Sequence, residues 1–80
     1  MKARVHVTLK REVLDPQGDA VRRALVSLGF TDVRDVRVGK LVEIELEGTD
    51  RARAETELRA MCEKLLANAI IEEFDFEIVG

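Results

Sequence analysis

The stretch Arg34-Asp35-Val36-Arg37-Val38-Gly39-Lys40-Leu41-Val42-Glu43-Ile44-Glu45-Leu46-Glu47 decides the fold that the sequence predicts. Its valines, isoleucine and last leucine occupy even positions, so in an extended chain they share one face, with charges on most of the other. A two-residue hairpin at Gly39-Lys40 would mix valines with glutamates on one face. We therefore predict one unbroken strand, bent or bulged at Gly39.

This strand is too long for the helices of its own chain. About 13 extended residues span about 43 Å, whereas a helix of about 14 residues spans about 21 Å. Half of the apolar face, including Val42 and Ile44, therefore needs another cover. A second copy of the chain is the simplest candidate, so we expect a homodimer or a higher oligomer.

Composition indicates a single globular domain over residues 1–80. Hydrophobic residues make up 46% and charged residues 36%, as in ordinary soluble domains. No apolar run approaches a membrane span and no signal-peptide pattern opens the chain, so we expect a cytoplasmic protein that does not contact a membrane. The single cysteine cannot form an internal disulfide, which agrees with a reducing compartment.

Charge is unevenly distributed along the chain. Residues 1–40 carry nine Lys/Arg and five Asp/Glu, whereas residues 41–80 carry four and eleven. This asymmetry fits either a basic face for a polyanion with an acidic face for a partner, or solvated charges scattered over a small domain. Because Tyr and Trp are absent and no aromatic residue lies on a predicted open sheet face, we expect no nucleic-acid binding.

The N-terminal half begins with a strand and a helix. Residues 3–10 alternate between apolar and polar side chains, which predicts a half-buried strand. Asp15 and Pro16 form a helix start, and Gly29 a left-handed helix end, so we predict a helix over residues 16–28. Its apolar stripe consists of Val21, Ala24, Leu25 and Leu28. Gly18 in the first turn indicates either a loosely formed start or close approach by another chain or a ligand phosphate.

The C-terminal half repeats the pattern. Gly48-Thr49-Asp50 predicts a turn and a cap for a helix that runs to about residue 67, where Asn68 ends it, and residues 71–79 alternate as a strand. The helix has an apolar stripe of Ala54, Leu58, Met61, Cys62, Leu65 and Leu66. Its outer face offers the i,i+4 pairs Arg51/Glu55, Arg53/Glu57, Glu55/Arg59 and Arg59/Glu63.

Together these elements predict an α+β two-layer sandwich, with two helices on one face of an antiparallel sheet. The order is strand, helix, long bent strand, helix, strand. This is related to the ferredoxin-like plan, with the two middle strands fused into one. The three aromatic residues, Phe30, Phe74 and Phe76, are predicted core residues.

The sequence shows no catalytic, cofactor-binding or metal-ligating set. His6 falls on the polar face of the first strand, and Cys62 lies on the buried edge of the second helix without a base or zinc partners. No carboxylate pair has a spacing typical of acid/base catalysis, and Gly18 lacks the Gly-Lys-Ser/Thr ending of a phosphate loop. We expect a chain that is not an enzyme on its own.

Several motifs resemble the PurS family, the small subunits of bacterial and archaeal phosphoribosylformylglycinamidine synthase. They are Val5-x-Val7-x-Leu9-Lys10, Val13-Leu14-Asp15-Pro16-Gln17-Gly18, Ala20-Val21-x-x-Ala24-Leu25-x-x-Leu28-Gly29-Phe30, Val36-Arg37-x-Gly39-Lys40 and Cys62-x-Lys64-Leu65-Leu66-Ala67-Asn68. The resemblance covers nearly the whole chain. It departs from the family at Ala69, where proline is usual, and at Glu12, where glycine is frequent.

The resemblance implies a non-catalytic subunit of a complex in de novo purine synthesis that uses ATP, Mg²⁺ and glutamine. Such a subunit is a dimer that joins a glutaminase subunit to a synthetase subunit and assists ammonia transfer, and it carries no cofactor itself. The alternative is a dimeric regulatory domain that senses a small molecule, similar to ACT domains, although those usually have two middle strands joined by a turn. The positions that we expect at partner interfaces are Asp15, Pro16, Gln17, Gly18, Arg37, Gly39, Lys40, Val42, Ile44 and Asn68.

Overall fold

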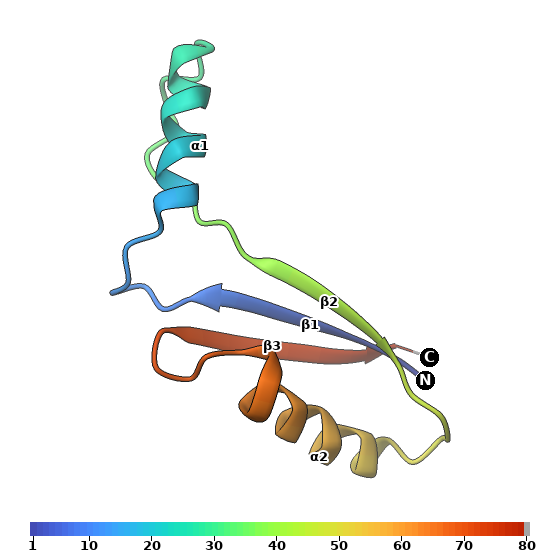
Figure 1. The fold of residues 1–80 in the computed structure, drawn as a ribbon. Helices are drawn as coiled ribbons and strands as arrows, with labels where there is room; N and C mark the ends of the chain where they lie inside the picture. Colours follow the sequence, from blue (N-terminus) through green and yellow to red (C-terminus); the bar gives the residue numbers. More distant parts are fainter. Residues whose placement is uncertain (80) are drawn as a thin grey trace.

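The computed structural model describes residues 1–79 and has the predicted order of elements (Figure 1). The elements are β1 (Lys2–Leu9), α1 (Pro16–Ser27), β2 (Lys40–Glu45), α2 (Arg51–Met61), a π-helical turn η1 (Cys62–Leu66) and β3 (Glu72–Val79). Asp15 caps α1 and Asp50 caps α2, each through its side chain, and Gly29 has a φ of 104° after α1. The α+β class and both helix starts are therefore confirmed.

The three strands form one antiparallel sheet in the order β2-β1-β3. In the register, Val5 of β1 lies opposite Val42 of β2 and Phe76 of β3, so the apolar positions of all three strands share one face. Leu58 and Cys62 of the second helical segment are fully buried against this face. The core thus lies between the sheet and α2 (Figure 1).

Charged side chains cover the opposite face of the sheet. Arg4 lies between Glu43 of β2, at 3.5 Å, and Glu77 of β3, at 3.7 Å. His6 pairs with Asp75 at 3.0 Å between His6 Nδ1 and Asp75 Oδ1. Basic residues from the first half of the chain therefore meet acidic residues from the second half, which favours the second interpretation of the charge asymmetry, solvated pairs rather than separate basic and acidic faces.

The predicted long strand is only half formed. β2 begins at Lys40, and residues 33–39 have no regular secondary structure. β2 begins directly after Gly39, the position at which the sequence predicted a bend or bulge, and a Cβ there would meet Val7 O at 2.8 Å and Thr8 Cγ2 at 2.7 Å, so glycine permits close contact with β1. The ladder between β1 and β2 ends at the Val7–Lys40 pair and β1 itself ends at Leu9, so residues 33–37 lie beyond β1 and have no strand of the described chain with which to form a ladder.

α1 extends away from the end of the sheet, and the residues that follow it return alongside it toward β2 (Figure 1). Its predicted apolar stripe is therefore largely exposed: Leu28 retains 74% of its accessible surface and Val21 retains 41%. Phe30 is 58% exposed, so its predicted place in the core is wrong. The physical reason is that α1 and Phe30 lie past the end of this chain's sheet, where no strand of the same chain can pack against them.

The second helix changes its winding at Cys62. Had the α-helix continued, Leu65 would lie on the buried face near Met61 and Cys62, but the wider π turn rotates Leu65 outward to 83% exposure. On the outer face the Arg53–Glu57 pair forms at 3.1 Å. No helix within residues 1–79 combines the length and the apolar character needed to cross a membrane.

Candidate docking corner

Asp15 is the central residue of the corner where α1 meets the sheet. Its carboxylate is buried, with 5% of the residue exposed. Asp15 Oδ2 accepts a hydrogen bond from Val38 N at 2.7 Å, and Oδ1 accepts one from Gly18 N at 3.0 Å. These bonds, first from Val38 and then from Gly18, lower the pKa of Asp15 from its ordinary value. One carboxylate thus caps α1 and fixes the segment that leads into β2.

Arg37 ties the same segment to the loop after β1. Its Nη2 donates to Lys10 O and to Val13 O, both at 2.9 Å. The positive charge of Arg37 also contributes to the low pKa of Asp15. Together Asp15 and Arg37 hold the two connections between α1 and the sheet in a fixed arrangement.

Gly18 has a structural role that the sequence analysis did not predict. A Cβ at this position would collide with Val36 O of the returning segment. Close approach by another chain or by a ligand phosphate was one of the two interpretations considered above. The approaching chain is instead the protein's own, and Gly18 is buried beneath it.

The remaining predicted positions divide between this corner and the sheet. Gln17, Gly39 and Lys40 line a shallow cleft of about 270 Å³ with Asp15 and Glu72. Asn68 is linked to the cleft because its N–H donates to Glu72 Oε1 at 2.7 Å. Pro16 is exposed at the start of α1. Val42 and Ile44 lie apart from the cleft, partly buried on the core face of the sheet.

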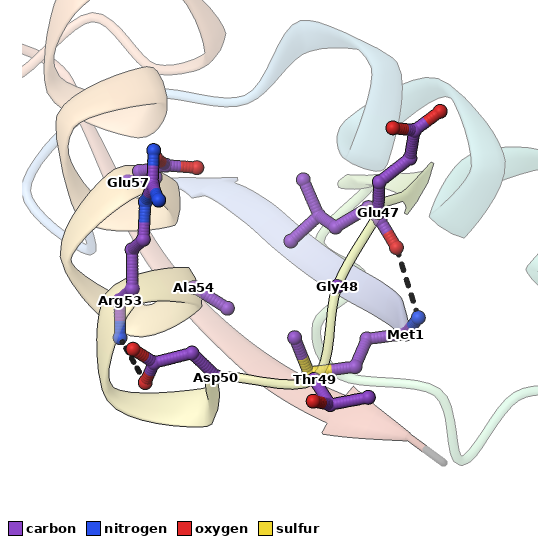
Figure 2. Close-up of a pocket in the computed structure, with 9 residues that line it drawn as sticks. Met1, Glu47, Gly48, Thr49, Asp50, Arg53, Ala54 and Glu57 are labelled. Carbon is purple, nitrogen blue, oxygen red and sulfur yellow. Dashed lines mark hydrogen bonds and ion pairs between the residues drawn. The ribbon is translucent and has the colours of Figure 1, made fainter.

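A second cleft, which the sequence analysis missed, lies at the other end of the sheet (Figure 2). It has a volume of about 420 Å³ and opens between the end of β2 and the start of α2, with Leu46 and Ala54 among its apolar walls. The chain start closes one side, because Met1 N donates to Leu46 O at 2.9 Å. The only sequence signal for this cleft was the turn at Gly48-Thr49-Asp50.

The reactive residue types do not form a catalytic set. His6 lies on the exposed face of the sheet beside Asp75, whereas Cys62 is buried in the core on the other face. Burial raises the pKa of the Cys62 thiol, which disfavours the thiolate. In the part of the chain that the structure describes, no three His, Cys, Asp or Glu side chains are grouped so that they could hold a metal ion.

Comparison with known proteins matches this chain to a protein family over nearly its whole length. The family model described as PurS, phosphoribosylformylglycinamidine (FGAM) synthase, matches residues 2–80. The chain is 48% identical over 77 residues to the phosphoribosylformylglycinamidine synthase subunit PurS of Bacillus subtilis, covering 96% of this chain and 90% of that protein.

Solved structures agree with this match. The Bacillus subtilis PurS structure superposes with a TM-score of 0.87 at 47% identity, covering 99% of this chain and 98% of that one. A chain in the structure of PurLQS from Thermotoga maritima gives a TM-score of 0.88 at 28% identity, covering 98% and 95%. The similarity therefore extends over the whole fold, including the separated helix.

Proposed function

This chain belongs to the PurS family and is a small subunit of phosphoribosylformylglycinamidine synthase in purine biosynthesis, and from this premise we propose that it joins the glutaminase and synthetase subunits and assists ammonia transfer between them. The observation that carries the proposal is the similarity, over nearly the full length of both chains, to a chain solved in a structure named PurLQS. A subunit with this role needs surfaces for partners rather than reacting groups.

The geometry supports a role in assembly. His6 and Cys62 lie on opposite faces of the sheet, too poorly placed for one to activate the other. Exposed apolar side chains are abundant: Leu14, Leu28, Leu65 and Ile70 each retain 74% or more of their accessible surface. In this proposal the ATP, Mg²⁺ and glutamine used by the complex bind to its other subunits, and this chain works in the cytoplasm together with a second copy of itself.

The docking corner supports contact with another subunit through its exposed residues. Asp15, Gly18 and Arg37 are engaged in contacts within the chain, so they shape the corner rather than reach outward. Pro16, Gln17, Lys40 and Asn68 remain exposed around the cleft. A rigid corner with an exposed polar rim is typical of a protein–protein contact.

Reconstitution tests the function. The glutaminase and synthetase subunits are mixed with and without this chain, and complex formation is followed by size-exclusion chromatography while glutamine-dependent amidination is measured with ATP and Mg²⁺. We expect the chain to be required for both. A full rate and a stable complex without the chain would refute the proposal.

Paired variants test the corner. Gln17→Glu adds one negative charge at the corner, and Thr56→Glu adds the same charge on the exposed face of α2. We expect Gln17→Glu to weaken complex assembly at least several-fold and Thr56→Glu to leave it unchanged. Equal assembly by the two variants would remove the corner from the interface.

The alternative, a small-molecule-sensing domain of ACT-like type, is not favoured. The family match extends over residues 2–80, and the relatives that share the fold are subunits of one synthase. Within residues 1–79 no hairpin joins two middle strands, because the chain passes through Gly39 directly into β2, and this also differs from the arrangement expected of such a domain.

A further inference from the structure

β3 forms one border of the sheet, because β1 lies on one side of it and no strand of the described chain lies on the other (Figure 1). Lys10 N donates to Ile71 O at 2.8 Å, so Ile71 O points toward β1 at the end of this ladder. Residues of an antiparallel strand point their backbone groups alternately to the two sides. The odd-numbered residues of β3 therefore bond to β1, and the backbone groups of its even-numbered residues point away from the sheet.

The outward groups at both ends of β3 already have partners. Glu72 N donates at 2.7 Å to a carbonyl oxygen of the turn before the strand. At the other end, Ile78 O accepts from the two terminal nitrogens of Arg51, at 3.3 and 3.4 Å. Between them, the outward N–H and C=O groups of Phe74 and Phe76 make no hydrogen bond within residues 1–79. We call these unpaired groups the free edge of β3, which is a template for one more short strand.

Two clefts lie along the free edge, between the core face of β3 and the second helical segment. The first has a volume of about 510 Å³ and is lined by Phe74 together with Cys62 and Ala67. The second has a volume of about 320 Å³ and is lined by Phe74, Phe76 and Arg59 of α2. The Arg59 guanidinium lies 5.5 Å from the centre of the Phe76 ring and forms a wall of the second cleft.

The two clefts are spaced like alternate side chains of a strand. Glu63, which lines the first cleft, follows Arg59, which lines the second, by one helical turn or about 6 Å. Side chains two residues apart on a strand share one face and are about 7 Å apart. A strand added to the free edge of β3 would therefore place successive apolar side chains in the two clefts.

The other face of β3 determines which charge an added strand should carry. This face presents Glu73, Asp75 and Glu77, all exposed. On the β1 side, Asp75 and Glu77 pair with basic residues at 3.0 and 3.7 Å, whereas Glu73 lies opposite the uncharged Thr8. Basic side chains on the outer side would add further favourable pairs. A second copy pairing through the same edge would instead place acids beside acids, which is destabilising.

We propose that the free edge of β3 receives an extended segment of another subunit of the synthase, in which basic and apolar residues alternate. The inference rests on the proposed function and specifies how one partner is held. The backbone of the segment bonds to Phe74 and Phe76, its apolar side chains enter the two clefts, and its basic side chains face the acidic residues of β3. Strand addition obtains affinity from main-chain hydrogen bonds and specificity from pockets for alternate side chains.

Three peptides test the chemistry of this segment on the full chain. The first is acetyl-Lys-Val-Lys-Val-Lys-Val-Lys-amide. The second has proline in place of the central valine, which keeps the charge but removes an N–H that the ladder needs. The third has glutamate in place of each lysine. In calorimetry we expect the first peptide to bind at least tenfold more tightly than the other two. Equal binding of the valine and proline peptides would reduce the interaction to charge attraction and overturn the proposal.

A pair of charge-reversal variants tests the position. Glu73→Lys changes the free face of β3 and leaves the pairs of Asp75 and Glu77 with β1 in place. Asp32→Lys makes the same change of charge at an exposed position beyond the end of α1. We expect Glu73→Lys to weaken binding of the lysine–valine peptide at least fivefold and Asp32→Lys to leave it unchanged. Equal weakening by both variants would contradict binding at β3.

Amide hydrogen exchange, resolved to single residues, tests the edge in the complex. In the isolated chain the N–H groups of Phe74 and Phe76 should exchange rapidly, whereas those of Asp75 and Glu77, which bond to β1, should exchange slowly. We expect Phe74 and Phe76 to become protected when the glutaminase and synthetase subunits are added. Protection already present in the isolated chain would mean that a second copy covers the edge, and would overturn the proposal.

The inference and the proposed function fail in different measurements. An active complex that requires this chain, but leaves Phe74 and Phe76 as exchangeable as in the isolated chain, would overturn the inference and leave the function intact. If the other two subunits assembled and carried out glutamine-dependent amidination without this chain, the function would be overturned, and with it the identity of the partner at β3.

Discussion

At the scale of single residues, Asp15 joins three parts of the chain through one carboxylate. It accepts hydrogen bonds from Gly18 in α1 and from Val38 before β2, and it lies beside Arg37, which binds the loop after β1. The sequence predicted the helix cap, because Asp before Pro is a common helix start. It could not predict the bond to Val38, which spans 23 residues and depends on how the chain returns from α1.

The lowered pKa of Asp15 predicts a pH-dependent contribution to stability. A carboxylate whose pKa is lower in the folded than in the unfolded chain stabilises the fold above the unfolded pKa, near 3.8, and loses this effect as the pH falls through the folded pKa. We expect Asp15→Asn to lower the thermal midpoint by several degrees at pH 7. The difference from wild type should shrink below pH 4. A difference that is independent of pH would show that the charge of Asp15 is not responsible.

Gly18→Ala separates helix propensity from tertiary contact. Alanine stabilises a helix interior by about 1 kcal/mol relative to glycine, so propensity alone predicts a stabilised variant. Because a Cβ at Gly18 collides with the backbone of Val36, we expect the opposite, a lower midpoint in urea unfolding. Gln17→Ala, in the same turn but exposed, is the control and should change stability little. A more stable Gly18→Ala variant would contradict the observed contact.

The burial of Cys62 predicts an unreactive thiol. The residue is fully buried, and burial raises the pKa of its thiol, so little thiolate is present at neutral pH. We expect Ellman's reagent to label the native protein far more slowly than the urea-unfolded protein at pH 8. Rapid labelling of the native protein would instead indicate frequent opening between the π turn and β3.

At the scale of elements, local patterns predicted β1, α1, α2 and β3 nearly to their ends. Alternation and capping depend on neighbouring residues, so a single sequence is sufficient to recognise them. The long strand was predicted from the same alternation, but a strand also needs a neighbour. β2 pairs with β1 only from Lys40 onward, and residues 33–37 lie beyond the end of β1. The outward rotation of Leu65 was missed for a related reason, because a π turn leaves no signal in an apolar stripe.

Adjacent residues of β2 test which face of the sheet is covered. Val42 lies on the core face and Leu41, 54% exposed, on the charged face. We expect Val42→Asp to destabilise the protein by roughly 2–4 kcal/mol, because it puts an unpaired charge into the apolar layer. Leu41→Asp should lower the free energy of unfolding by only about 1 kcal/mol, because leucine and aspartate differ by about this much in their preference for a β-strand. Urea unfolding at equal protein concentration measures both, and equal losses would contradict the assignment of the faces.

At the scale of the whole molecule, the chain combines a small core with a large exposed surface. Its fully buried large side chains are Leu58, Val5, Val7 and Cys62, while apolar residues at the helix ends and loops stay exposed. Such a chain gains stability from the partners that cover these residues. The clefts at the docking corner and at the start of α2 lie at opposite ends of the sheet, so the surfaces around them are separate from each other.

The choice of nitrogen source tests whether this subunit works by assembly. If the chain joins the glutaminase to the synthetase, amidination from glutamine should depend on it strongly, because ammonia must pass from one subunit to the other. Amidination from added ammonium should depend on it much less. His6→Ala and Cys62→Ser should leave the glutamine-dependent rate within a few-fold of wild type, since loss of a true acid, base or nucleophile typically costs about 10²-fold or more. If amidination depended on the chain equally with both nitrogen sources, the chain would shape the synthetase site itself. If the rate collapsed in either variant while the complex still assembled, the chain would contribute a reacting group.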